Sequence, residues 1–391
     1  MASQFERVYV DAFIDLYFSR FRLLSSNCVA ENVAEIPEEV KKRIYDASCD
    51  AGFCMPVTPS MVDARAFTVR GYQARLAELL RAPGIAQRTT EWYEARKTLI
   101  TASDVAQALG EGKFGNQRQL IAKKCGYEVE KPFNAMIPPL KWGVMYEPVA
   151  QGLYSTRNST SIHEFGLLRH RTVEHLGASP DGITPYGVML EIKCPYRRKI
   201  DGTVPRQYYY QIQAQLEVCG LHECDYLECE LSEYRDWEGF LADAASEDAW
   251  FRTQEQMPKG VVAEFRSELL DPSSGDAQPR YSYVFADRVS PNELAEWLAA
   301  QRAVADFYCF HYWHLVKYSC IRVYRDDEFV STMLAKLGEV WQKIESYKGD
   351  RDAYVKDVCK GVDPNNVVAP IPKCPPKSVQ AQGYAFIDED A

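Results

Sequence analysis

Residues 179–195 read SPDGITPYGVMLEIKCP, and this stretch decides the fold. Alternating side chains of a strand face opposite sides, so Glu191 and Lys193 project to one side, about 6.6 Å apart. Leu190 and Ile192 then face the core. The turn residues 184–187 (TPYG) reverse the chain and lay Glu191 beside Asp181. The stretch therefore predicts a short hairpin that presents two carboxylates and an ammonium together.

These three side chains suit the hydrolysis of a phosphodiester. The reaction needs a hydroxide at neutral pH and neutralisation of the charge that develops on the phosphorane. The carboxylates of Asp181 and Glu191 can hold Mg²⁺, which prefers oxygen ligands, and Mn²⁺ can substitute. Lys193 can orient the attacking water and stabilise the transition state. Upstream, Glu147 lies in the first turn of an expected helix that tolerates Pro148, and can supply a further ligand.

The spacing D-x(9)-E-x-K, with Pro180 before the aspartate, is the pattern of PD-(D/E)XK nucleases. By itself it is short, and an E-x-K in a strand is more often a solvent-facing ion pair. The segments around it strengthen the interpretation. They resemble, in order within residues 87–220, the family of lambda exonuclease and the YqaJ-like viral recombinases, including those of large DNA viruses. The matching stretches are QRTTEW at 87–92, AR at 95–96, ITAS at 100–103, WGVMYE at 142–147, SPDG at 179–182, LEIKCP at 190–195 and YQIQ at 210–213.

The resemblance implies a role for each of several residues. It implies that Asp181, Glu191 and Glu147 are metal ligands, with the backbone carbonyl of Ile192 as a further one. Lys193 takes the place of the catalytic lysine, and Gln211 that of the glutamine on the following helix that faces the site. The residues agree with this, because Gln211 and Gln215 are four positions apart and share one helix face.

The resemblance also implies a pocket for a terminal 5′-phosphate, made of Arg96, Ser103 and Ser179. A terminal phosphate carries more charge than an internal diester, and a guanidinium with hydroxyls is a natural receptor for it. Ser103 can equally cap a helix that begins at Asp104, and both roles can hold together. A further phosphate-binding arginine is expected in the basic run 197–199, among Arg197, Arg198 and Lys199.

The fold class expected is mixed α/β (α+β): a restriction-endonuclease-like core with a central mixed sheet flanked by helices. We expect a helical N-terminal extension over 1–85, a nuclease domain over 86–360 with an insertion at about 232–312, and a disordered tail over 361–391 that is rich in Pro and polar residues. Within the domain the patterns predict strands at 226–231, 261–265, 281–285 and 318–324, and helices at 291–307 and 328–347. The aromatic residues between 307 and 313 either edge a core or stack on unpaired bases.

Composition excludes several classes of protein. The net charge of −10 argues against indiscriminate coating of nucleic acid, although it allows a local basic groove. No apolar run approaches the length of a membrane span, and the first residues do not resemble a signal peptide, so we expect a protein that is not secreted and stays in the cytoplasm, or in a viral factory if the source is viral. Twelve scattered cysteines without a CxxC pair favour reduced, packed thiols over a metal cluster or disulfides.

The function expected is a Mg²⁺-dependent DNA exonuclease that degrades linear duplex 5′→3′ from a 5′-phosphate and leaves 3′ single strands for recombination or repair. An endonuclease of the same superfamily, or an inactive protein that binds DNA ends, are the alternatives, because fold does not fix function. Expected partners are double-stranded DNA ends, a single-strand annealing protein and further copies of the chain. The resemblance implies a trimer. The extension and the insertion put that trimer in doubt, because added elements can block or remake its interface.

Overall fold

The computed structural model describes residues 4–20, 36–51, 57–113, 115–127, 137–266 and 279–359. A six-stranded sheet with the order β4-β5-β6-β9-β7-β8 forms its centre. β5 and β6 pair in parallel, whereas the other neighbours are antiparallel, so the sheet is mixed as predicted. The strands are β4 (Gly182–Ile183), β5 (Met189–Lys193), β6 (Glu223–Tyr234), β7 (Lys259–Phe265), β8 (Arg280–Phe285) and β9 (Phe307–Tyr324).

A second, three-stranded sheet has the order β1-β3-β2. It consists of β1 (Ile100–Thr101), β2 (Leu168–Arg169) and β3 (Leu176–Ala178). Because β3 ends one residue before Ser179, this small sheet leads directly into the SPDG turn. It thereby joins the segment around residue 100 to the hairpin that carries Asp181 and Glu191.

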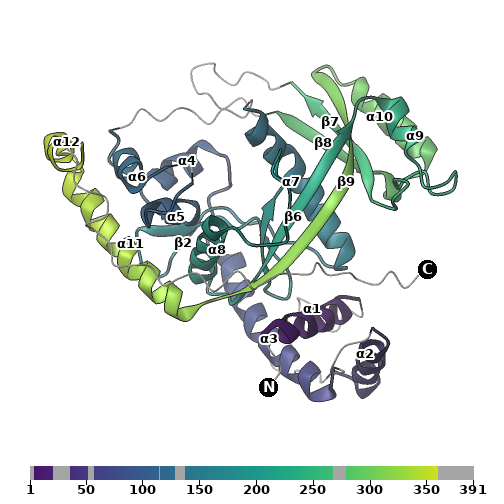
Figure 1. The fold of residues 1–391 in the computed structure, drawn as a ribbon, viewed down its shortest axis with the longest axis horizontal. Coiled ribbons are helices and arrows are strands. Elements are labelled where there is room, and N and C mark those ends of the chain that lie inside the picture. Colours follow the sequence, from purple (N-terminus) through teal and green to yellow (C-terminus); the bar gives the residue numbers. More distant parts are fainter. Residues whose placement is uncertain are drawn as a thin grey trace.

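Helices cover both faces of the larger sheet, and β6 and β9 cross the molecule as its longest strands (Figure 1). The helices are α1 (Gln4–Arg20), α2 (Glu38–Asp50), α3 (Pro59–Arg81), α4 (Thr90–Lys97), α5 (Val105–Ala108), α6 (Gln117–Lys124), α7 (Pro138–Arg157), α8 (Arg206–Cys219), α9 (Trp237–Ala242), α10 (Pro291–Arg302), α11 (Asp327–Tyr347) and α12 (Arg351–Cys359), with 3-10 turns η1 (Ala102–Asp104) and η2 (Ala286–Arg288). The mixed α/β class expected from the sequence is therefore confirmed.

Strand β5 separates two hydrophobic clusters. Leu190 and Ile192 pack with Met145, Val149 and other apolar residues of α7. Met189 packs on the opposite side, with the apolar residues of α8 and α11. The even-numbered positions of the strand thus face α7, and the odd-numbered positions, Glu191 and Lys193 included, face α8. This is the division between packing and chemistry that the alternation of side chains predicts.

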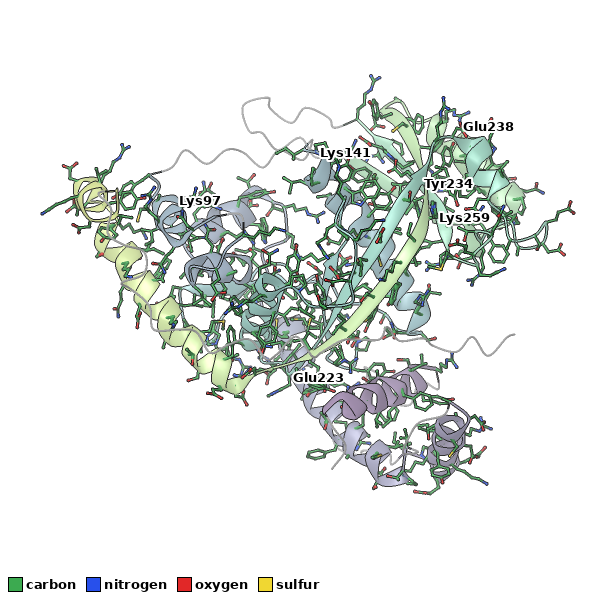
Figure 2. The ribbon with its side chains drawn as sticks, in the orientation of Figure 1. Lys97, Lys141, Glu223, Tyr234, Glu238 and Lys259 are labelled. Atoms are coloured by element: carbon green, nitrogen blue, oxygen red, sulfur yellow. The ribbon has the colours of Figure 1, made fainter. Side chains whose placement is uncertain are left out.

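The N-terminal helices α1, α2 and α3 form a cluster of their own, which reaches the rest of the chain at Tyr186. A buried ion network ties them to the sheet: Arg65 of α3 contacts Asp15 of α1 and Glu223 at the start of β6. Glu223 lies where the N-terminal helices meet the sheet (Figure 2). The domain boundaries at 85 and 360 remain a proposal, and the tail predicted as disordered lies outside the described residues.

Two predicted elements have different bounds. The helix expected over 291–307 ends at Arg302, and the strand expected over 318–324 begins at Phe307. The physical reason is tertiary pairing: residues 307–314 hydrogen-bond with β7, and residues 312–324 with β6. Trp313 is fully buried on this strand, whereas Tyr308 is 57% exposed. The aromatic run therefore lies at the edge of a core and extends from there to the solvent. No helix in the described residues is long and apolar enough to span a membrane.

Candidate active site

The hairpin that carries the candidate site is built by a tight turn after Asp181. The Thr184 amide donates to the Val188 carbonyl at 2.8 Å, and Gly187 closes the turn with φ +73°, a conformation that favours glycine. Gly182 pairs with Leu190, which places Asp181 beside Glu191 and Ile192, the residues that follow Leu190 on β5. The amide of Ile192 donates to Asp181 Oδ2 at 2.7 Å. The sequence-based interpretation that the turn lays these segments together therefore matches the observed hairpin.

Glu191 is a fully buried carboxylate held by three donors. Gln211 Nε2 donates to its Oε1 at 2.7 Å, and Gln215 Nε2 donates to its Oε2 at 2.8 Å. The ammonium of Lys193 also contacts Oε1. Because Gln211 and Gln215 lie one turn apart on α8, a single helix face fixes both oxygens of the carboxylate.

Glu147 approaches the same place from α7. The expectation that Glu147 lies in the first turn of its helix is wrong, because α7 already begins at Pro138, and Pro148 lies inside the helix. Arg88 Nη2 pairs with Glu147 Oε2 at 2.9 Å, and Arg88 itself has φ +64°. Burial, countered in part by Arg88 and Lys193, raises the pKa of Glu147. Burial and the charges of Glu191 and Glu147 raise the pKa of Asp181 well above its usual range. Three carboxylates are therefore crowded into one low-dielectric site.

This crowding is the structural test of whether a divalent cation fits. Three buried or half-buried carboxylates repel one another when ionised, and a hard cation relieves that repulsion and accepts oxygen ligands. Asp181, Glu191 and Glu147 offer such oxygens, and Ile192 lies between Glu191 and Lys193 with its amide already on Asp181. Oxygen donors alone suit Mg²⁺ or Mn²⁺ by their chemistry, although these three carboxylates are not among the described groups whose ligand atoms all lie within 4.8 Å of one another. Ligand roles for these residues, including the Ile192 carbonyl, remain proposals.

Lys193 is a charged group in this site. Burial lowers the pKa of its ammonium, but the carboxylates of Glu191 and Asp181 outweigh burial, and the net pKa is raised. Its Nζ also lies 4.9 Å from the centre of the Tyr208 ring. A cation held between carboxylates and an aromatic face is a fixed point charge, available to a phosphate that enters beside it.

The residues predicted to bind a 5′-phosphate also lie together. Arg96 Nη2 donates to Ser103 Oγ at 3.1 Å, and the guanidinium stacks 4.2 Å from the centre of the Trp92 ring. Trp92 Nε1 in turn donates to Ser179 Oγ at 3.0 Å. The three predicted residues are thus linked through Trp92, and Ser179 is two positions before Asp181.

The alternative interpretation was that Ser103 caps a helix, and the structure contradicts it. Thr101 is the N-cap of η1, and Asp104 completes a capping box with it. Ser103 lies inside η1, with its hydroxyl shared between Thr101 Oγ1 and Arg96. The capping role is therefore wrong, because Thr101 occupies the N-cap position and forms the capping box with Asp104.

The basic run after β5 divides into different environments. The guanidinium of Arg198 contacts the buried Glu228, and the ammonium of Lys199 contacts Glu230, so both pair with acids of β6. Arg197 is exposed, with its guanidinium 5.2 Å from the centre of the Tyr196 ring. The sequence left open which of the three meets a phosphate; the ion pairs favour Arg197.

Comparison with known proteins supports the resemblance. Residues 91–222 match the model of the YqaJ-like viral recombinase domain. This part of the chain resembles a YqaJ-like domain. Every predicted site residue, from Arg96 to Gln211, lies within the matched range. Arg88, which pairs with Glu147, lies just before it.

One of two viral relatives matches more of the chain than this segment. An uncharacterized protein of Acanthamoeba polyphaga mimivirus is 25% identical over 309 residues, 71% of this chain and 56% of the relative. A protein of African swine fever virus is 26% identical over 184 residues, 35% of this chain and 52% of the relative. The chain thus spans about half the length of the curated relatives it matches.

Among solved structures, an alkaline exonuclease from Laribacter hongkongensis has a TM-score of 0.40 and 19% identity, covering 68% of this chain and 98% of that one. A phage related exonuclease from Haemophilus somnus has a TM-score of 0.34 and 10% identity, covering 65% of this chain and 95% of that one.

Three residues of the site were missed in the sequence. Trp92 and Arg88 lie in the stretch that resembles the family, but their partners are 87 and 59 positions away, and no local pattern indicates them. Tyr208, beside Lys193, precedes Gln211 by three positions on α8, so the helical spacing that singled out the glutamines could have found it.

Proposed function

We propose that this protein is a metal-dependent DNA exonuclease that degrades linear duplex DNA 5′→3′ from a 5′-phosphate. The product would be a 3′ single strand for recombination or repair. The observation that carries the proposal is the link from Ser103 through Arg96 and Trp92 to Ser179, which joins a cationic pocket to the segment of Asp181. An endonuclease has no terminal phosphate for such a pocket to hold.

The residues have distinct parts in the proposed reaction. Asp181, Glu191 and Glu147 would hold Mg²⁺ or Mn²⁺, which supplies charge neutralisation and an activated nucleophile. Lys193 stabilises negative charge that develops on the phosphate, because its ammonium is fixed between carboxylates and the Tyr208 ring. Gln211 and Gln215 keep both oxygens of Glu191 in position.

The partners follow from this activity. Double-stranded DNA ends are the proposed substrate, and a single-strand annealing protein would receive the 3′ strand. We further propose that the chain forms a homo-oligomer and acts in the host cytoplasm or a viral factory. The viral relatives support this location, and the YqaJ-like viral recombinase domain supports a role in recombination.

A digestion experiment tests the proposal. Linear duplexes labelled at the 5′ or the 3′ end, and a covalently closed circle of equal length, are incubated with the protein and Mg²⁺. We expect early release of the 5′ label as mononucleotide, late release of the 3′ label, and an intact circle. A reaction in EDTA and one in Ca²⁺ serve as controls and should show no release, because Ca²⁺ has looser geometry.

Other outcomes would replace the proposal. Cutting of the circle as fast as the linear duplex would establish the endonuclease alternative. Binding to ends without any release, in Mg²⁺ and in Mn²⁺, would establish an inactive end-binding protein.

A further inference from the structure

A second group of ligand-type side chains lies away from the candidate active site, on strands β7 and β9. Glu264 of β7 is the direct register partner of Cys309 of β9, and His311 is two positions further on β9, on the same face. His311 Nε2 is 2.8 Å from Glu264 Oε2 and 3.4 Å from Cys309 Sγ. Cys309 Sγ is 4.0 Å from Glu264 Oε2. A nitrogen, a sulfur and an oxygen therefore converge on one point.

The surroundings aim these atoms at that point. Glu233 Oε1 of β6 lies 3.1 Å from His311 Nδ1, so the second ring nitrogen is occupied and Nε2 faces the cluster. Tyr146 of α7 donates its hydroxyl to the same Glu233 oxygen at 2.7 Å. A metal-binding histidine usually donates its second ring N–H to a carboxylate, and that carboxylate is in turn held by a hydrogen bond, as Tyr146 holds Glu233 here.

Glu264 divides its two oxygens between different neighbours. Its Oε1 pairs with Lys141 Nζ at 2.7 Å, while Oε2 is the oxygen that faces Cys309 and His311. Lys141 belongs to the first turn of α7, at the end of the helix beside this part of the sheet (Figure 2). The lysine therefore fixes the carboxylate without occupying the oxygen that faces the cluster.

The spacing of the three atoms is close to that of a tetrahedral zinc site. Ideal bond lengths of about 2.0 to 2.3 Å at tetrahedral angles separate nitrogen and oxygen ligands by about 3.3 Å, and sulfur from either by about 3.6 Å. The observed separations of 2.8, 3.4 and 4.0 Å differ from these by about 0.5 Å or less. A small rotation of the imidazole and the thiol makes up the difference.

We propose that Glu264, Cys309 and His311 form a zinc site that is distinct from the magnesium site of the proposed nuclease. A thiolate with an imidazole and a carboxylate suits zinc, whereas Mg²⁺ prefers oxygen ligands alone. Cys309 and His311 are half-buried, so a water can complete the four ligands. The ion would join β7 to β9 and, through Glu233 and Tyr146, brace the helix that carries Glu147.

The competing state is a protonated histidine without a metal. Burial lowers the pKa of His311, but hydrogen bonds with Cys309, Glu233 and Glu264 raise it to about 11. An imidazolium between two carboxylates is a stable ion-pair cluster. Zinc must displace that proton and the thiol proton of Cys309, and the experiment decides between the two states.

The test measures zinc binding by the full chain, reduced and stripped with EDTA. The titration is carried out in excess Mg²⁺, which would occupy the carboxylates of the proposed active site. We expect one zinc ion per chain, a rise in melting temperature with zinc, and, with Co²⁺ in its place, the absorption band of a thiolate ligand. Cys309→Ser should weaken zinc binding by at least about 10-fold and remove the cobalt–thiolate band.

Matched variants keep the result interpretable. Cys125→Ser removes another half-buried thiol and should bind zinc like wild type. Glu233→Gln leaves all three ligands and should weaken binding by about 10-fold to 100-fold, which serves as the second test if Cys309→Ser does not fold. Absence of zinc binding by the wild type, or equal binding by Cys309→Ser and wild type, would overturn the proposal and leave an ion-pair cluster.

Discussion

Glu191 shows how one residue can be committed to chemistry and not to packing. Its side chain is fully buried on the α8 face of β5, yet it contacts two amides and an ammonium instead of apolar groups. Burying a carboxylate is unfavourable unless donors satisfy it. The contacts of Glu191 therefore do little more than offset the cost of desolvating its carboxylate, so a functional role explains its position better than stability does.

The first prediction concerns Arg96. Replacing Arg96 by Ala should remove the preference of the enzyme for 5′-phosphorylated duplex over 5′-hydroxyl duplex. The reason is loss of a charge-assisted hydrogen bond to the phosphate, a kind worth about 1.5 to 3 kcal/mol, so a preference of about 10-fold to 150-fold should fall toward unity. Rates on the two substrates, measured under single-turnover conditions, check this.

Lys97→Ala, on the next residue of α4, serves as the matched control and should keep the preference. Equal rates on both substrates with the wild-type protein would show that Arg96 does not bind a terminal phosphate.

At the scale of elements, the loop after β5 is fastened to β6 by ion pairs. Arg198→Ala should lower the free energy of unfolding by about 1 to 3 kcal/mol, because it leaves the fully buried Glu228 without its cation. Arg197→Ala should change stability by less than about 0.5 kcal/mol, since its side chain is exposed, and should weaken DNA binding instead. Urea unfolding and a DNA-binding titration of each variant separate the two roles. A large loss of stability in Arg197→Ala with none in Arg198→Ala would reverse this assignment.

The elements also show where sequence patterns suffice. The hairpin of β4 and β5 was predictable, because a turn with Gly187 and alternating side chains are local signals. The start of β9 was not, since Phe307 to Trp313 become a strand through pairing with β7, which is more than 40 positions earlier. The same holds in the site: the pair Gln211 and Gln215 follows from helical spacing, whereas the contact of Trp92 with Ser179 depends on the finished fold.

At the scale of the whole molecule, the N-terminal helices are attached through buried charge. Arg65 is 3% exposed and donates to both Asp15 and Glu223, and Arg322 of β9 also contacts Glu223. Arg65→Ala should lower the free energy of unfolding by about 3 to 5 kcal/mol, because two carboxylates lose a buried partner.

Urea denaturation checks the Arg65 prediction. Arg43→Ala is the control, since Arg43 forms an exposed pair with Glu39 on α2 and should change stability by about 0.5 kcal/mol or less. A loss no greater in Arg65→Ala than in Arg43→Ala would mean that the N-terminal helices are held by other contacts.

The most direct test of the account is the rate at which Lys193→Ala releases nucleotides from a 5′-phosphorylated linear duplex in Mg²⁺. Loss of the ammonium should slow release by about 100-fold to 10 000-fold, because no other group replaces a charge fixed beside the reacting phosphate. The variant should stay folded, as judged by circular dichroism, since the core positions Leu190 and Ile192 are untouched. Lys348→Ala, which removes an exposed ammonium, should digest DNA at the wild-type rate. Digestion by folded Lys193→Ala at the rate of wild type would contradict the placement of the active site at this hairpin.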